Sequence, residues 1–131
     1  MGTVVSQLSV DAHDPLALAR WWADVLGWTV DPDEDEGTVD LLPPDGAATP
    51  WIFVPVPDDK RTKNRLHVDL RPADGDDQAT ELTRLLALGA VRADVGQGDD
   101  VSWHVLADPE GNEFCLLSRT LAQVARDAAA G

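Results

Sequence analysis

The side chains best suited to chemistry lie in the second half of this chain. His67 and Asp69 are two residues apart in an apolar segment, so on a strand they would share one face. A histidine beside a carboxylate can act as an acid–base pair, because the carboxylate orients the imidazole ring. The same spacing also arises by chance in a half-solvated sheet, where the histidine has only a structural role. Both interpretations of His67 and Asp69 stay open at this point.

A second group of candidates lies nearer the C-terminus. Cys115, the only cysteine, could act as a nucleophile if His67 or His104 removed its proton. A free cysteine is more often a small buried hydrophobic residue, and we favour that interpretation here. Trp103 and His104 are adjacent in an expected strand, so only one of them can face a pocket. A tryptophan in that place could stack on a flat or cationic ligand.

The elements that must position these side chains occur twice in the sequence. Each half begins with an apolar strand, continues through an Asp-initiated helix that ends at glycine, and closes with further strands. In the first half we expect strands at 3–10, 38–42 and 51–54, with an acidic loop at 31–36. In the second half we expect strands at 65–71, 91–95, 101–106 and 113–117. Tight-turn sequences occupy corresponding places in the two halves: Pro43-Pro44-Asp45-Gly46 and Asp108-Pro109-Glu110-Gly111.

Three helices are expected, two of them amphipathic and equivalent. Asp14 and Pro15 are suited to the start of the first helix, because aspartate accepts hydrogen bonds from free N–H groups and proline fits the first turn. Its apolar face comprises Leu18, Trp21, Trp22, Val25 and Leu26. Asp74 or Asp76 is expected to cap the second helix, whose inner face is Leu82, Leu85 and Leu86. The Ala-rich segment 120–130 predicts a short C-terminal helix.

This order predicts an α+β fold made of two βαβββ modules. Two units that each expose one sheet face are expected to form a curved mixed sheet around a cavity, with helices on the other side. We interpret residues 1–131 as a single domain. Its parts are module one at about 3–57, a polar linker at 58–64, module two at about 65–118 and a tail at 119–131.

Three segments carry a resemblance to a known superfamily. They are the first helix with Trp21-Trp22-Ala23-Asp24-Val25-Leu26-Gly27, the turn Asp108-Pro109-Glu110-Gly111-Asn112-Glu113-Phe114, and the opening Lys63-Asn64-Arg65-Leu66-His67-Val68-Asp69-Leu70. In these segments the chain resembles the vicinal oxygen chelate superfamily of glyoxalases, extradiol dioxygenases and bleomycin-binding resistance proteins. The resemblance covers roughly residues 3–118 and implies a glyoxalase-like fold.

The resemblance also implies where a metal would be held. Members of the superfamily bind a divalent metal with one residue from the first and last strand of each module, usually His or Gln and then Glu. By position these places fall on Gln7, Val54, His67 and Cys115. Val54 cannot coordinate a metal, whereas Gln7, His67 and Cys115 could hold a soft one such as zinc. We therefore expect a metal-free or atypical cavity, with a divalent metal at those three residues as the alternative.

Three function hypotheses follow. The first is a small-molecule-binding protein of glyoxalase-like fold that needs no cofactor. The candidate ligand-binding residues are Gln7, His67, Asp69, Trp103, His104 and Cys115. The second is a divalent-metal-dependent lyase, isomerase or dioxygenase, with His67, Asp69 and Cys115 as candidate catalytic residues. The third, an interaction domain without a ligand, would show a filled cavity.

Charge and composition limit the partners. The net charge of −14 disfavours nucleic acid and anionic membranes, whose affinity for proteins comes mainly from Lys and Arg. It would attract cationic ligands, although solubility is the interpretation of the acidic charge that we favour. The single cysteine allows no internal disulfide, and we find no secretory signal and no apolar run of membrane-spanning length. We therefore expect a cytoplasmic protein. The resemblance further implies a homodimer, with modules paired within one chain or exchanged between chains.

Overall fold

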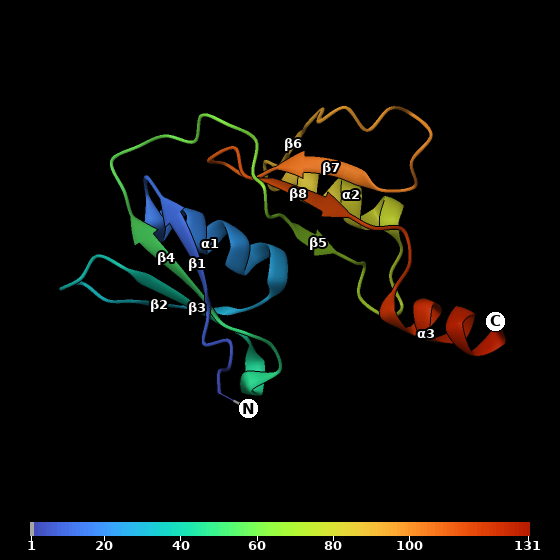
Figure 1. Cartoon of the computed structure of the whole chain (residues 1–131), viewed down its shortest axis with the longest axis horizontal. Helices are drawn as coiled ribbons and strands as arrows, with labels where there is room; N and C mark the ends of the chain where they lie inside the picture. The colour runs from blue at the N-terminus through green and yellow to red at the C-terminus, as the bar shows by residue number, and fades with distance from the viewer. Residues whose placement is uncertain (1) are drawn as a thin grey trace. The chain divides into compact units, whose positions relative to one another are not determined.

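The computed structural model describes residues 2–131, which form two compact units with their boundary between Lys60 and Arg61 (Figure 1). The first unit contains β1 (Leu8–Ala12), α1 (Pro15–Leu26), β2 (Thr29–Pro32), β3 (Val39–Leu42), the 3-10 turn η1 (Pro44–Gly46) and β4 (Trp51–Pro55). The second contains β5 (Val68–Leu70), α2 (Gln78–Ala87), β6 (Val91–Arg92), β7 (His104–Ala107), β8 (Glu113–Leu116) and α3 (Leu121–Ala130). The boundary between the units falls inside the predicted linker, and the grouping of both into one domain stays a prediction.

Each unit is built on a mixed four-stranded sheet with the same strand order. The orders are β1-β4-β3-β2 and β5-β8-β7-β6. In both sheets the first and last strands of the unit pair in parallel, and the remaining pairs are antiparallel. A parallel pair needs a crossover connection, which the helix and the two intervening strands supply. The prediction of an α+β fold with two βαβββ modules is therefore confirmed.

α1 covers the first sheet because its sequence determines both ends and one face. Asp14 accepts a hydrogen bond from the Ala17 N–H at 3.2 Å, and Gly27 ends the helix in the left-handed conformation with φ of 71°. The helix buries the predicted Trp21 and Trp22, and the ring of Trp22 lies at a centroid distance of 5.1 Å both from Trp21 and from Trp51 of β4. Four of the five tryptophans thus belong to the first unit, three of them buried.

The second sheet buries one face through alternate residues of its central strands. Phe114 and Leu116 of β8 and Leu106 of β7 are at most 1% exposed, as is Leu85 of α2. In Figure 1, α2 lies behind β7 and β8. Since side chains alternate along a strand, Glu113 and Cys115 point to the opposite face of β8. That opposite face is the one on which a site can form.

The cap of α2 differs from the prediction. Asp77, rather than Asp74 or Asp76, is the N-cap, and its side chain accepts a hydrogen bond from the Thr80 N–H at 2.8 Å. Asp76 belongs to the preceding turn, where its N–H donates to the Ala73 carbonyl. Asp74 instead accepts from the Ala122 N–H at 3.0 Å, in the first turn of α3. The segment Asp74-Gly75-Asp76-Asp77 offers several residues suited to an N-cap, and the contacts of Asp74 and Asp76 elsewhere leave Asp77 in that position.

Replacing Asp77 with alanine is expected to destabilise α2 in a pH-dependent way. The backbone hydrogen bond from Thr80 lowers the pKa of Asp77 below its usual 3.8, so the folded state favours the ionised carboxyl. Its contribution is full above about pH 4 and is lost as pH falls through the lowered pKa. The thermal unfolding midpoint of Asp77→Ala should therefore lie below that of the parent at neutral pH, and the difference between the two midpoints should become smaller as the pH is lowered. Circular dichroism measures both midpoints. Asp77→Asn, which keeps a capping oxygen, should show a smaller gap at neutral pH; a pH-independent gap would contradict the assignment.

Several strand boundaries differ from the prediction because strands need partners. β1 begins at Leu8 rather than residue 3, since its partner β4 begins at Trp51, and Val4 and Val5 are 92% and 79% exposed. β5 and β6 are likewise shorter than expected, and β7 begins at His104. β2 was not predicted, because part of it overlaps the expected acidic loop; it pairs with β3 in register Asp31↔Asp40. Local composition alone does not reveal where a ladder ends.

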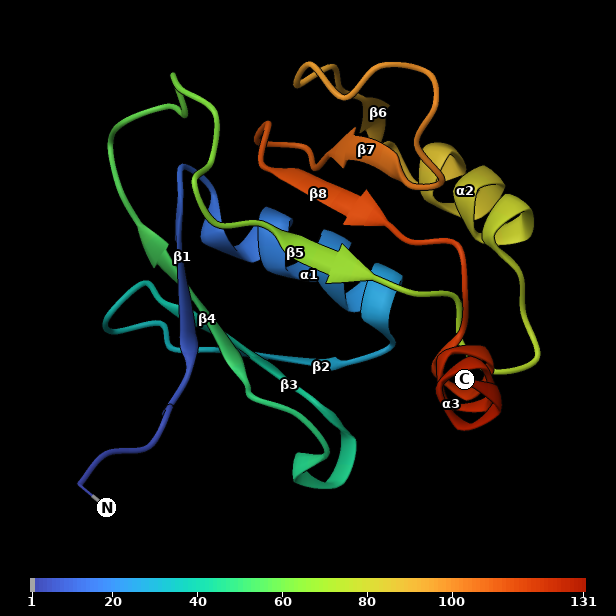
Figure 2. The same ribbon diagram turned by 45° about the vertical axis from the view of Figure 1, so that its right-hand side comes forward.

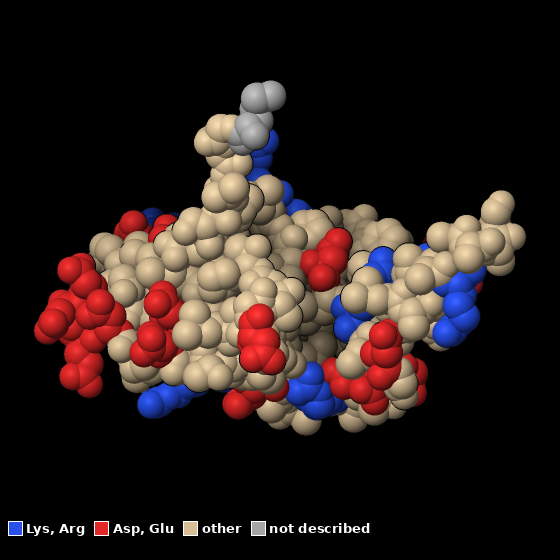
Figure 3. All heavy atoms as spheres, turned by 90° about the horizontal axis from the view of Figure 1, so that it is seen from below, with Lys and Arg blue, Asp and Glu red and all other residues tan. Residues whose placement is uncertain are grey.

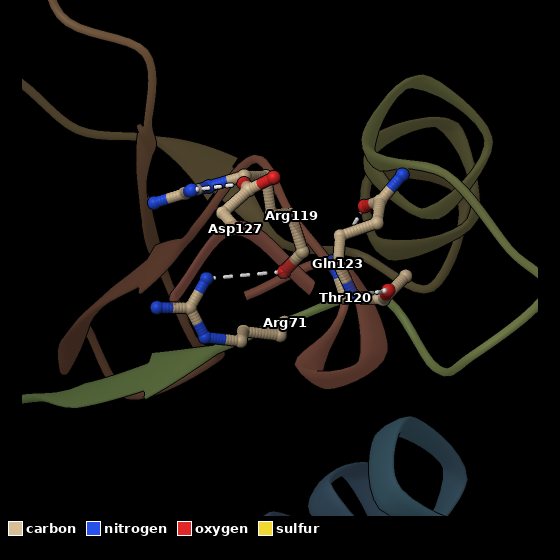
Figure 4. Close-up of polar contacts among 5 residues, drawn as sticks. All are labelled: Arg71, Arg119, Thr120, Gln123 and Asp127. Atoms are coloured by element: carbon tan, nitrogen blue, oxygen red, sulfur yellow. Dashed lines mark hydrogen bonds and ion pairs between the residues drawn. The ribbon is translucent and has the colours of Figure 1, made fainter. Parts of the chain in front are cut away.

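The predicted C-terminal helix is confirmed as α3, and polar contacts attach it to the rest of the second unit (Figure 4). Thr120 is its N-cap and forms a capping box with Gln123. Arg71, just after β5, donates to the Arg119 carbonyl at 3.1 Å, and Arg119 pairs with Asp127 (Figure 4). Among residues 2–131, no helix is long and apolar enough to cross a membrane.

Candidate functional site

A pocket of about 530 Å³ opens on the face of the second sheet that carries Glu113 and Cys115. It lies over β5, β8 and β7, which run side by side in Figures 1 and 2. The residues that line it are Lys63, His67, Asp69, Val95, Gln97, Trp103, Val105, Glu113, Cys115 and Leu117. All of them belong to the second unit, so the pocket is described entirely within that unit.

The floor of the pocket is a row of three side chains across three strands. Asp69 of β5 is opposite Cys115 of β8, and Cys115 is opposite Val105 of β7. Side chains that are opposite each other on one face of a sheet lie in contact range. The register therefore places a carboxylate, a thiol and an apolar group in line.

His67 and Asp69 form a contact at one end of this row. The distance from His67 Nδ1 to Asp69 Oδ1 is 3.1 Å, and the two side chains are 41% and 49% exposed. The sequence predicted His67 inside a strand at 65–71, whereas in the structure His67 lies one residue before β5. The spacing of two residues nevertheless places both side chains on the pocket. This geometry suits an imidazole whose orientation is held by the carboxylate while its other nitrogen is available.

Cys115 lies deeper, at 8% exposure. Burial raises the pKa of the Cys115 thiol, and the charge and hydrogen bonding of Asp69 raise it further, while Lys63 acts in the opposite direction. The group is therefore a protonated thiol at neutral pH, and it is a weak nucleophile in that form. The burial and the raised pKa of Cys115 thus favour the interpretation of a small buried residue over that of an activated nucleophile.

Trp103, and not His104, lines the pocket. Val105 faces the pocket, so by alternation Trp103 lies on the same side while His104 and Leu106 are directed to the other. Trp103 is 39% exposed, which leaves one part of the indole open to a ligand. The sequence left this choice open, and the register of β7 against β8 resolves it.

Six lining residues were not among the predicted site residues, and three of the six are polar: Lys63, Gln97 and Glu113. Glu113 accepts a hydrogen bond from the Asn64 N–H at 3.1 Å, and Lys63 donates to the Asn64 carbonyl at 3.1 Å. Gln97 accepts from the Val95 N–H at 2.8 Å and donates to the Ala93 carbonyl at 3.2 Å. For Glu113 a signal existed, because it shares the strand face of Cys115. Lys63 and Gln97 come from loops, which carry no periodicity.

The four places that the resemblance assigns to a metal do not form a matching ligand set. Gln7 was expected within the strand at 3–10, but it is exposed and precedes β1 in the first unit. Val54, half-buried in β4, offers no donor atom. Only His67 and Cys115 remain of the four, and neither is the carboxylate that a hard divalent ion prefers. We therefore derive no chemical step through a metal at these four places.

A different set of donors does come together. Within residues 2–131, His67, Asp69 and Cys115 each offer one ligand atom, and these atoms lie within 4.8 Å of one another. Asp69 was predicted as part of an acid–base pair and as a residue that binds a small molecule, but not as a metal ligand. The grouping depends on the parallel register of β5 and β8, which brings Asp69 beside Cys115.

Comparisons with known proteins agree with this fold. The family described as "Glyoxalase-like domain" matches residues 7–117. Among solved structures, the chain is similar to the oxidase ChaP-H2, with 23% identity, a TM-score of 0.63 and coverage of 91% of this chain and 95% of that one. A comparison with the curated proteins found no match.

Two further structures share the fold at lower identity. A variant of the fosfomycin resistance protein FosX from Listeria monocytogenes, in complex with Mn(II) and a dihydroxypropylphosphonic acid, has 14% identity and a TM-score of 0.70, with coverage of 98% and 99%. TnmS3, an antibiotic-binding protein from a Streptomyces species, has 19% identity and a TM-score of 0.56, with coverage of 89% and 97%. These structures show the shared fold, and the family match over most of the chain identifies this protein as a member of the glyoxalase-like domain family, within the vicinal oxygen chelate superfamily.

Proposed function

We propose that this chain binds a small aromatic molecule, of cationic or neutral charge, in the pocket of its second unit. The observation that carries the proposal is the combination, in one open pocket, of apolar surface with a few polar groups. Trp103, Val105 and Leu117 contribute the apolar surface, and His67 and Asp69 contribute polar groups. Ligand sites in proteins have this composition, with few polar groups that orient a mostly apolar molecule.

The charge of the protein supports a cationic ligand. The chain carries a net charge of −14, and Figure 3 shows several separate groups of acidic side chains on the face that it draws. Two carboxylates, Asp69 and Glu113, line the pocket beside one ammonium group, that of Lys63. Such a field raises the local concentration of cations and opposes anions. The antibiotic-binding relative TnmS3 is consistent with a binding role for this fold.

Replacing Trp103 with alanine is expected to weaken the binding of a cationic aromatic dye, thioflavin T, by about tenfold, because the indole supplies stacking and cation–π contacts. Dye fluorescence or calorimetry measures the change, and Trp103→Phe should retain part of the affinity. Leu121→Ala is the matched control, since Leu121 is an exposed apolar residue outside the pocket. Unchanged dye binding by Trp103→Ala, or preferred binding of the anionic dye anilinonaphthalene sulfonate, would contradict the proposal.

The His67–Asp69 contact favours a second candidate, an enzyme that uses His67 as acid or base. In the form that the resemblance implies, this enzyme would be a divalent-metal-dependent lyase, isomerase or dioxygenase. Turnover that requires an added divalent metal and is lost in His67→Ala would separate this candidate from simple binding. An interaction domain without a ligand is disfavoured, because the pocket is open rather than filled. A homodimer and a cytoplasmic location remain expectations.

A further inference from the structure

We propose that His67, Asp69 and Cys115 form a zinc-type metal site that is complete within the second unit. It differs from the arrangement that the superfamily implies, which takes ligands from both modules. It also goes beyond the proposed binding function, which needs no metal. The inference rests on the clustering of three donor atoms within 4.8 Å of one another on the floor of an open pocket.

The spacing of the three donors is close to what a tetrahedral ion requires. Zinc binds nitrogen and oxygen ligands at about 2.0–2.2 Å and sulfur at about 2.3 Å, so its ligand atoms lie about 3.3–3.8 Å apart. Rotamer adjustments of about 1 Å would therefore close the site. Asp69 and Cys115 need no backbone movement for this, because they are already opposite each other in the β5–β8 ladder.

The donor types select the metal. One imidazole nitrogen, one carboxylate oxygen and one sulfur form a mixed set that suits zinc or cobalt, whereas magnesium and manganese prefer oxygen ligands. One carboxylate and one thiolate would balance the two positive charges of the ion, so the bound site would be neutral. A neutral complex lowers the free-energy cost of placing an ion beside the buried Cys115 and Val105.

The pocket supplies an entry path and an open coordination position. His67 and Asp69 are partly exposed while Cys115 is buried, so an ion entering from solvent meets the imidazole and carboxylate first. Glu113 lies on the same face but outside the three-donor cluster. Three protein ligands leave the fourth position to water or to a ligand in the pocket, as in catalytic rather than structural zinc sites.

The test uses the whole 131-residue chain, stripped with a chelator and titrated with Co²⁺ and Zn²⁺. Binding of Co²⁺ should produce a near-ultraviolet band of thiolate-to-cobalt charge transfer, and Cys115→Ser should abolish it. Asp69→Asn and His67→Ala should each lower Zn²⁺ affinity by about tenfold to a hundredfold, at least as much as the loss of an outer-shell partner. Mn²⁺ should bind about a hundredfold more weakly than Zn²⁺.

Two control variants make the outcome decisive. Gln7→Ala should leave Zn²⁺ affinity unchanged, because Gln7 belongs to the first unit and to the site that the resemblance implies. Asp99→Asn, at an exposed acidic residue, should also have no effect. Binding that survives all three site variants, binding that depends on Gln7, or the absence of the cobalt–thiolate band would each overturn the proposal. Circular dichroism of Cys115→Ser verifies that the variant is folded.

The same preparations separate this proposal from the proposed function. Thioflavin T binding by the metal-stripped protein, with its loss in Trp103→Ala, tests the ligand pocket without the metal. Zinc binding with no dye binding would support the metal site alone, and the reverse result would support only the ligand pocket.

Discussion

Replacing Phe114 with alanine is expected to lower the free energy of unfolding by about 3–5 kcal/mol, the range typical of a fully buried phenylalanine. Phe114 is 1% exposed and lies in β8, the strand that pairs with both β5 and β7. Removing its ring leaves a cavity behind the pocket floor, because Cys115 follows it in the chain and points to the opposite face. The measurement is urea denaturation followed by far-ultraviolet circular dichroism, which reports both units, whereas four of the five tryptophans report mainly the first.

A milder substitution at the same position provides the control. Phe114→Leu keeps most of the buried volume and should cost less than about 1.5 kcal/mol. Phe53 occupies the equivalent place in β4 of the first unit and is 0% exposed. Phe53→Ala should therefore be destabilising by a similar amount. A loss below about 1 kcal/mol for Phe114→Ala would show that this residue is not in a packed core.

Replacing Asp108 with alanine is expected to destabilise the protein by about 2–4 kcal/mol, because several hydrogen bonds to one buried carboxylate are lost together. Asp108 is 4% exposed. Its Oδ1 accepts from the N–H groups of Glu110 at 2.9 Å and Asn112 at 3.0 Å, and the Asn112 side chain donates to Oδ2 at 3.0 Å. These hydrogen bonds shape the turn that leads from β7 into β8. Their loss in Asp108→Ala should therefore also make the amide hydrogens of β8 exchange faster with solvent.

Two variants test whether the hydrogen bonds are responsible. Asp108→Asn keeps a side-chain oxygen for the backbone N–H groups and should cost about 1 kcal/mol, less than alanine does. Asp99→Ala removes an exposed aspartate in the same unit and should stay within about 0.5 kcal/mol of the parent. If Asp108→Ala stayed equally close to the parent, the turn would not depend on this carboxylate.

The site combines two places that the resemblance assigns to metal ligands, His67 and Cys115, with other residues of the second unit. Of the other two assigned places, Val54 offers no donor atom and Gln7 is exposed and lies outside β1. Asp69 takes on a new relation to Cys115 through the β5–β8 register. Trp103 adds an aromatic wall from the residue before β7. The result is a pocket suited to an organic ligand, with a compact set of mixed donors on its floor.

Features that depend on neighbours in sequence were predicted correctly. The repeat of strand, Asp-capped helix and glycine stop indicated two βαβββ modules, and the i, i+3, i+4 spacing identified the buried face of α1. Alternation placed His67 with Asp69. The period of a helix face and the direction of side chains along a strand are local properties, so local residue types are sufficient to predict them.

Features that depend on partners distant in sequence were not predicted correctly. The cap of α2 is Asp77 because Asp74 contacts α3 and Asp76 belongs to a turn. The extent of β1 was overestimated, because β4 provides no partner for residues before Leu8.

The amino-acid sequence by itself determined the duplicated α+β modules and the first helix, and it singled out His67, Asp69 and Cys115 as candidate site residues. Only the tertiary structure decided that Trp103 rather than His104 faces the pocket, and that Asp69 lies opposite Cys115. The physical reason is that register between strands is a long-range choice. A shift of one residue would turn each side chain to the other face of the sheet, and packing of the whole buried face, not the local sequence, prevents that shift.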